Sequence, residues 1–254
     1  MTFQSQRRGL AIALVLAGLA APLSLSRVSA EDQSDQVIAG RLAEFLRSAR
    51  TVISQYQELI NDQAKSDKGL TGERVLAEAT VIYQKQTGED PAAVDPASKE
   101  GKLLRAQMDA IKDVMAENQS AINAPNVGFK GFIPAIFARL VNEKFQEKAG
   151  GQALIKVTAP EDLVRNRKAR PDDWEKQVLT DKFAKPDWPK GQGFSETAAI
   201  GGRAAFRLIV PEYYKPSCLA CHGSPKGEMD ITGYPKEGGK EGDLGAAISV
   251  TLFQ

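Results

Sequence analysis

Cysteine and histidine, two side chains that bind transition metals readily, occur in this chain in a single cluster. Both cysteines and the only histidine of the 254 residues lie in the run Cys218-Leu219-Ala220-Cys221-His222. A C-x-x-C-H run is typical of c-type haem attachment, in which the two thiols form thioethers with the haem vinyl groups and the adjacent imidazole binds the iron. The sequence therefore predicts one covalently bound haem c, held by Cys218 and Cys221, with His222 as the proximal iron ligand.

Two other uses of the same residues compete with haem attachment. A zinc site needs about four Cys, His or carboxylate ligands, and the chain has no second group of Cys or His. A thioredoxin-like dithiol normally follows an early βα unit, whereas this motif lies near the C-terminus in a segment rich in Gly and Pro. The dithiol stays open as the alternative to haem attachment.

The N-terminus indicates export. A pair of arginines precedes an apolar run over residues 10–19, and small residues follow up to Ala30. This order is typical of a signal peptide, so we expect residues 1–30 to be cleaved after Ala30 and the mature protein to be periplasmic. An apolar run this short does not favour a transmembrane helix, although an uncleaved N-terminal membrane anchor stays open as an alternative.

The charge balance gives no support for nucleic-acid binding. The chain has 33 Lys and Arg against 32 Asp and Glu, a formal net charge of +1. Residues 1–30 carry three arginines and no acidic residue, so the remaining 224 residues carry a net charge of −2. A nucleic-acid-binding domain is normally strongly basic.

The hydrophobic pattern predicts an α+β protein. Apolar residues three and four positions apart indicate helices over residues 35–62, 71–86, from Ser98 onward, and about 134–149. Beyond Gly151 the pattern changes to strands over 153–158, 194–200, 203–210 and 245–253, with a two-glycine hairpin at 201–202 and a short helix around 173–182. We expect these helices to pack on a small antiparallel sheet from which a haem loop, residues 211–242, projects.

Residues 31–254 are expected to form a single haem-binding domain. Its first part, residues 31–122, is the helical N-terminal part, and residues 123–254 are the α+β haem-binding part. About 224 residues are enough to bury an adequate core.

Three segments carry a family resemblance. They are residues 166–175 (NRKARPDDWE), 213–223 (YYKPSCLACHG) and 242–250 (GDLGAAISV). In this order they resemble a family of exported c-type haem proteins, catalogued as a domain of unknown function, whose fold is similar to PAS sensor domains. The resemblance is firm over about residues 120–254. It implies a PAS-like sheet and, for some members, a place in the sensory part of a membrane receptor.

The chain departs from that family pattern in two respects. The sequence ends at Gln254, soon after the last predicted strand, so we expect a separate partner, or a retained N-terminal anchor, to carry any signal. Some haem members supply a second axial ligand from a cysteine in the N-terminal helices. This chain has no cysteine outside the motif, so that ligand is absent.

The function therefore depends on what occupies the sixth coordination position of the iron, opposite His222. With no further His or Cys, the sixth position falls to Met, Lys, Tyr, water or nothing. Met108 and Met115 lie seven residues apart on one predicted helix face and are candidates, although Met commonly fills gaps in a core. A position without a strong protein ligand would accept a small gas such as NO, CO or O2.

Other candidate residues flank the motif. Arg165 begins a basic cluster with Arg167, Lys168 and Arg170, which suits pairing with the haem propionates or else forms a solvated loop. Tyr213 and Tyr214 adjoin the attachment site, and we expect them to line the haem.

Two functions follow from these features, and neither is enzymatic. The chain has no second histidine for a triad or a peroxidase arrangement and no phosphate-binding motif. The first hypothesis is a periplasmic redox or small-gas sensor, or ligand-binding module. The alternative is a monohaem electron-transfer protein, which would favour two firm axial ligands. The expected partners are a small gaseous ligand or a redox partner protein, with no nucleic acid, and a membrane only if the N-terminal segment is retained.

Overall fold

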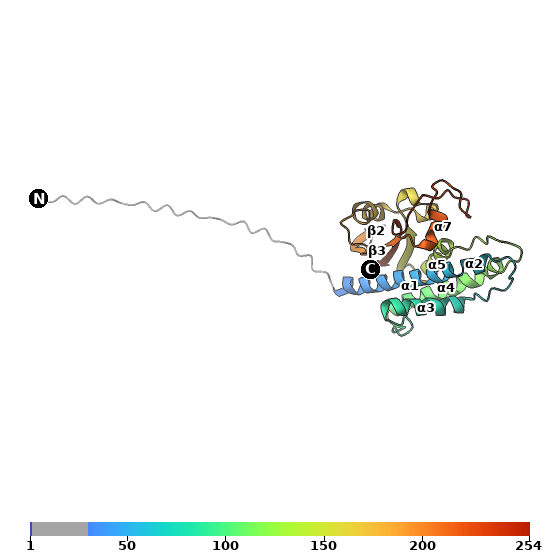
Figure 1. Cartoon of the computed structure of the whole chain (residues 1–254). Coiled ribbons are helices and arrows are strands. Elements are labelled where there is room, and N and C mark those ends of the chain that lie inside the picture. The colour runs from blue at the N-terminus through green and yellow to red at the C-terminus, as the bar shows by residue number, and fades with distance from the viewer. Residues whose placement is uncertain (2–29) are drawn as a thin grey trace.

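The computed structural model describes Met1 and residues 30–254 (Figure 1). The signal peptide predicted over residues 1–30 falls on residues 2–29, outside the described residues, and stays a prediction. Within the described part of the chain, none of the helices combines the length and the apolar character that a membrane crossing requires.

The N-terminal half is helical, as the spacing of apolar residues predicts. The side chain of Thr71 accepts a hydrogen bond from the backbone N of Arg74, and that of Ser98 accepts one from the backbone N of Gly101. Each is an N-cap that satisfies an amide of the first helical turn. The helices are α1 (Ala30–Gln55), α2 (Gln57–Asn61), α3 (Gly72–Thr87), α4 (Lys99–Ile122) and α5 (Pro134–Lys148).

The helix predicted over residues 35–62 is divided into α1 and α2 at Tyr56. The backbone of Tyr56 leaves the helical region, with φ −95° and ψ 10°. Its phenol oxygen accepts a hydrogen bond from Arg74 at 2.7 Å and donates one to Glu78 at 2.9 Å. Both partners lie on α3, so the break coincides with a tertiary contact that apolar spacing alone does not reveal.

The C-terminal half contains an antiparallel sheet of four strands in the order β1-β4-β3-β2. The hairpin between β2 and β3 turns at Gly201 and Gly202, whose φ angles are 57° and 81°. Positive φ at both turn residues is typical of this tight hairpin and favours glycine. The strands are β1 (Ala153–Thr158), β2 (Phe194–Ile200), β3 (Arg203–Tyr213) and β4 (Leu244–Phe253), so β1 and β2 have the predicted bounds.

Strand β3 runs three residues further than predicted. Pro211 and Glu212 continue its pairing with β4, opposite Ala247 and Ala246, and the register becomes irregular only between Glu212 and Tyr213. The loop predicted over residues 211–242 is therefore shorter at its start. We call residues 214–243, which join β3 to β4, the attachment loop.

The N-terminal helices cover one face of the sheet, and the main hydrophobic core lies between these two layers (Figure 1). α1 and α5 pack directly on the strands. Phe206 and Leu208 of β3 belong to this core, whereas Ile209 belongs to a smaller cluster on the opposite face, as the alternation of side chains along a strand requires. The α+β fold class is thus confirmed.

The smaller cluster is covered by the segment between β1 and β2. A short helix, α6 (Asp173–Val178), continues into a π-helical turn over Leu179–Phe183. Together they account for the helix predicted around residues 173–182. The turn Arg167–Ala169 precedes them, and this segment also carries Arg165 to the attachment loop.

Candidate haem-attachment site

The C-x-x-C-H run folds as a short helical segment of the attachment loop. A 3₁₀ turn over Pro216–Cys218 leads into α7, Leu219–His222. Cys218 and Cys221 are unpaired and partly buried. Residues three apart on a helical segment lie on one side of it, so both thiols are available to a single ligand.

Tyr214 supports the histidine of the motif. The rings of Tyr214 and His222 are stacked, with centroids 5.0 Å apart and planes inclined by 19°. A Cβ at Gly239 or Gly245 would come within 2.5 or 2.2 Å of Tyr214 ring carbons, so the ring requires glycine at both positions. Burial raises the pKa of Tyr214 to about 12. Its phenol is therefore neutral at physiological pH.

Glu237 orients the imidazole of His222. Nδ1 lies 2.9 Å from Glu237 Oε2, so a neutral ring donates its Nδ1 proton to the carboxylate and keeps its lone pair on Nε2. Among the described residues, no hydrogen bond engages Nε2, and the side chain is 30% exposed. A metal-binding histidine has this arrangement, with one nitrogen fixed by a carboxylate and the other directed to the metal.

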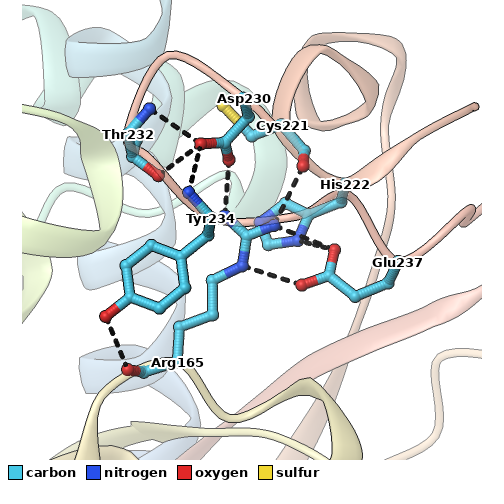
Figure 2. Close-up of polar contacts among 7 residues, drawn as sticks. All are labelled: Arg165, Cys221, His222, Asp230, Thr232, Tyr234 and Glu237. Atoms are coloured by element: carbon cyan, nitrogen blue, oxygen red, sulfur yellow. Dashed lines mark hydrogen bonds and ion pairs between the residues drawn. The ribbon is translucent and has the colours of Figure 1, made fainter. Parts of the chain in front are cut away.

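Arg165 connects two acidic side chains of the attachment loop, Asp230 and Glu237 (Figure 2). Of its five N–H donors, two bind the Glu237 carboxylate at 2.7 and 3.0 Å, one binds Asp230 at 2.6 Å, and one binds the carbonyl oxygen of Cys221 at 2.9 Å. The ring of Tyr234 lies beneath it, with its centroid 5.4 Å from the guanidinium carbon. Arg165 therefore ties the segment before α6 to the motif.

These contacts assign Arg165 a role that the propionate hypothesis did not include. Its guanidinium already forms charged hydrogen bonds to protein carboxylates, so a propionate would have to share or displace them. Lys168 of the same basic cluster pairs with Glu143 on α5 at 2.7 Å. Contact between Arg165 and a haem propionate stays a prediction.

The charges of the network stabilise one another. Burial opposes ionisation of Glu237 and Asp230, but hydrogen bonds outweigh it and hold both pKa values below the usual range, with Arg165 a donor to each. Burial also raises the pKa of the Cys221 thiol, with Asp230 adding to the effect.

Met108 and Met115 pack in the helical layer. Met115 is fully buried in the main core, and Met108 packs against that core from α4. None of residues 214–243, all of them described, belongs to the main core. Both methionines therefore contribute to the main core, and iron ligation by either one stays a prediction.

Tyr213 and Tyr214 have different partners. Its hydroxyl accepts a hydrogen bond from the backbone N of Gly191 at 3.2 Å. Tyr213 and Tyr214 line a depression of about 300 Å³ beside the start of the attachment loop, together with Arg47 and Lys215. The predicted contact of either tyrosine with haem stays a prediction.

The donor set fits haem c. Two unpaired thiols share one helical segment, and the following imidazole has Nδ1 engaged by a carboxylate and Nε2 without a protein partner among the described residues. An α+β fold with a C-x-x-C-H loop between two strands places the protein in the class of candidate c-type haem proteins.

Comparison with known families agrees with that class. The chain belongs to the Tll0287-like family, whose model matches residues 85–252. This family is associated with c-type haem proteins. The family resemblance is thereby confirmed, whereas the PAS-like fold stays a prediction. Neither the curated proteins nor the solved structures include a match to the chain.

Glu237 and Asp230 do not stand out in the sequence as site residues. Asp230-Ile231-Thr232-Gly233 has the composition of an Asx turn, and Asp230 Oδ1 indeed accepts a hydrogen bond from Thr232 N at 2.7 Å. That signal predicts a turn but no partner. Glu237 lies 15 residues beyond His222, and no local pattern relates it to the imidazole.

Proposed function

We propose that the chain is an exported monohaem c-type protein. Cys218 and Cys221 form the thioether bonds, and His222 Nε2 is the proximal iron ligand. The observation that carries the proposal is the His222 ring, which is stacked on Tyr214 and has Nδ1 bonded to Glu237. Because Nδ1 is engaged, the lone pair on Nε2 is ready for a metal.

The protein residues hold and orient the group. Bound haem supplies an iron that changes oxidation state and binds small molecules. The two thiols fix the attachment point, Glu237 fixes the tautomer of His222, and Arg165 fixes Glu237. Tyr214 limits rotation of the imidazole by stacking against it. The proposal includes no catalytic step.

We further propose that the iron serves as a redox or small-gas sensor in the periplasm. The placement of Met108 and Met115 in the helical core supports a sixth position without a firm protein ligand. Such a position accepts NO, CO or O2. The signal would pass to a separate partner protein, or through the N-terminal segment if that segment is retained as an anchor.

A monohaem electron-transfer protein is the second candidate. The partial exposure of the His222 side chain, 30%, favours it, because a haem near the surface can exchange electrons with a docked redox partner. An electron carrier would keep two firm axial ligands in both oxidation states, whereas a gas sensor needs an open or displaceable one.

Absorption and EPR spectra of the purified holoprotein, with and without CO or NO, separate the two functions. The sensor proposal predicts that CO changes the spectrum of the reduced protein at stoichiometric concentration. Six-coordinate low-spin haem in both states, unchanged by CO, would favour the electron carrier instead. His222→Ala is the control for the proximal ligand, and an unaltered haem spectrum in that variant would contradict the assignment.

A further inference from the structure

We propose that Glu237 is a positioning residue that sets the electron density His222 delivers to iron, and thereby lowers the reduction potential of the site. The inference rests on the proposed function, because it needs haem bound to His222. It concerns Glu237, a residue outside the attachment motif, and the network that holds it.

The backbone brings Glu237 to the histidine. Gly239 N donates to the His222 carbonyl at 2.8 Å, and Gly238 N donates to the Gly223 carbonyl at 3.0 Å. Residues 238 and 239 therefore run alongside the end of α7. The Glu237 carboxylate reaches Nδ1 from a fixed backbone position.

The side chain of Glu237 is fixed as well. Arg165 binds both of its carboxylate oxygens, and Arg165 is itself held by Asp230, whose carboxylate is fully buried. Asp230 accepts further hydrogen bonds from Thr232 and Tyr234. The contact between Glu237 and His222 thus ends a chain of charged hydrogen bonds (Figure 2).

A carboxylate at Nδ1 makes the imidazole a stronger donor at Nε2. Hydrogen bonding of this kind raises the basicity of a ligating histidine, and a more basic ligand stabilises the ferric state relative to the ferrous state. The negative charge of Glu237 acts in the same direction. Both effects lower the midpoint potential.

Glu237→Gln keeps the side-chain length and an acceptor oxygen but removes the charge. Glu228→Gln is the matched control, because Glu228 lies in the same loop and pairs with Lys236 at 2.7 Å. The control therefore makes the same change in net charge without touching His222. The measurement is the midpoint potential of each holoprotein, followed by the iron–histidine stretching frequency of the reduced form.

We expect Glu237→Gln to raise the ratio of reduced to oxidised haem at a fixed potential about tenfold, which is 59 mV for a one-electron couple. The iron–histidine frequency falls in the same variant. Glu228→Gln leaves the frequency unchanged and shifts the potential much less. Equal potential shifts in the two variants, or no shift in Glu237→Gln, would overturn the inference.

Glu237→Asp keeps the test open if the glutamine variant does not fold or take up haem. The charge is retained, but the shorter side chain withdraws the carboxylate from Nδ1. The potential is expected to rise although the net charge is unchanged, and a wild-type potential and frequency would overturn the inference. A wild-type protein without covalent haem would instead overturn the proposed function, so the two failures are distinguishable.

Discussion

The helical layer and the attachment loop are stabilised by different forces. α1, α3, α4 and α5 meet in a continuous apolar core whose large side chains, such as Phe45 and Phe137, are fully buried. In the attachment loop only Tyr214, Gly223 and Asp230 are buried, and the contacts are mostly ion pairs and hydrogen bonds. Apolar burial therefore determines the stability of the fold, whereas a small polar network determines the geometry of the site.

Truncating a core aromatic residue should produce the largest effect and separate the two regions. Phe45 is fully buried and meets the ring of Tyr83 edge to face at 5.6 Å. Phe45→Ala should lower the free energy of unfolding by about 3–5 kcal/mol, measured by denaturant unfolding. The haem spectrum of the folded fraction should not change. Val81→Ala, at an exposed position of α3, is the control and should cost less than about 0.5 kcal/mol. Equal losses of unfolding free energy in the two variants would contradict the role given to apolar burial.

Removing Arg165, which binds two carboxylates of the attachment loop, should have a smaller and local effect. Arg165→Met leaves the carboxylates of Asp230 and Glu237 without their shared donor, at a cost of about 1–3 kcal/mol. Hydrogen exchange should accelerate at the amides of Thr232 and Tyr234, which donate to Asp230, while helical amides keep their protection. Lys168→Met, a change at an exposed lysine, should leave the exchange rates of the loop amides and of the helical amides unchanged. Uniform acceleration in Arg165→Met would show that the two regions are not separable.

Acid should open the attachment loop before it unfolds the helices. The pKa values of Asp230 and Glu237 are lowered in the folded protein. The two ionised carboxylates therefore stabilise the fold fully at pH values above their pKa in the unfolded chain, about 3.9 for Asp and 4.3 for Glu. This stabilisation is lost as the pH falls through their lower pKa values in the folded protein. As the pH is lowered from 6 to 2, the Tyr234 amide should lose its protection from hydrogen exchange first. The helical circular dichroism signal should fall only at lower pH. Loss of both signals at the same pH would contradict the view that the loop and the helices are stabilised separately.

Replacing the core methionine should have the smallest effect. Met115→Leu conserves volume and apolar character, so it should cost less than about 1.5 kcal/mol and leave the haem spectrum unchanged. Met108→Leu should behave in the same way. Loss of a methionine-to-iron charge-transfer band in either variant would show that α4 supplies an axial ligand.

The elements with strong local signals could be predicted from the sequence. The caps Thr71 and Ser98 begin α3 and α4 as expected, and two glycines mark the β2–β3 hairpin. The extension of β3 to Tyr213 could not be predicted in this way, because it depends on pairing with β4 across the attachment loop.

The site was predictable only where its residues are consecutive. Cys218, Cys221 and His222 form a motif, whereas the Arg165 contacts to Asp230 and Glu237 join residues 65 and 72 positions apart. Such pairs depend on how the segment between β1 and α6 packs against the attachment loop. The basic cluster alone therefore did not reveal that Arg165 binds the carboxylates of Asp230 and Glu237.

Intact mass of the purified protein tests covalent attachment most directly. The wild-type chain, produced where c-type haem can be attached, should carry the mass of one haem that persists after denaturation, and Cys218→Ala/Cys221→Ala should carry none. A wild-type protein without haem, whose two thiols both react with an alkylating reagent, would contradict the account.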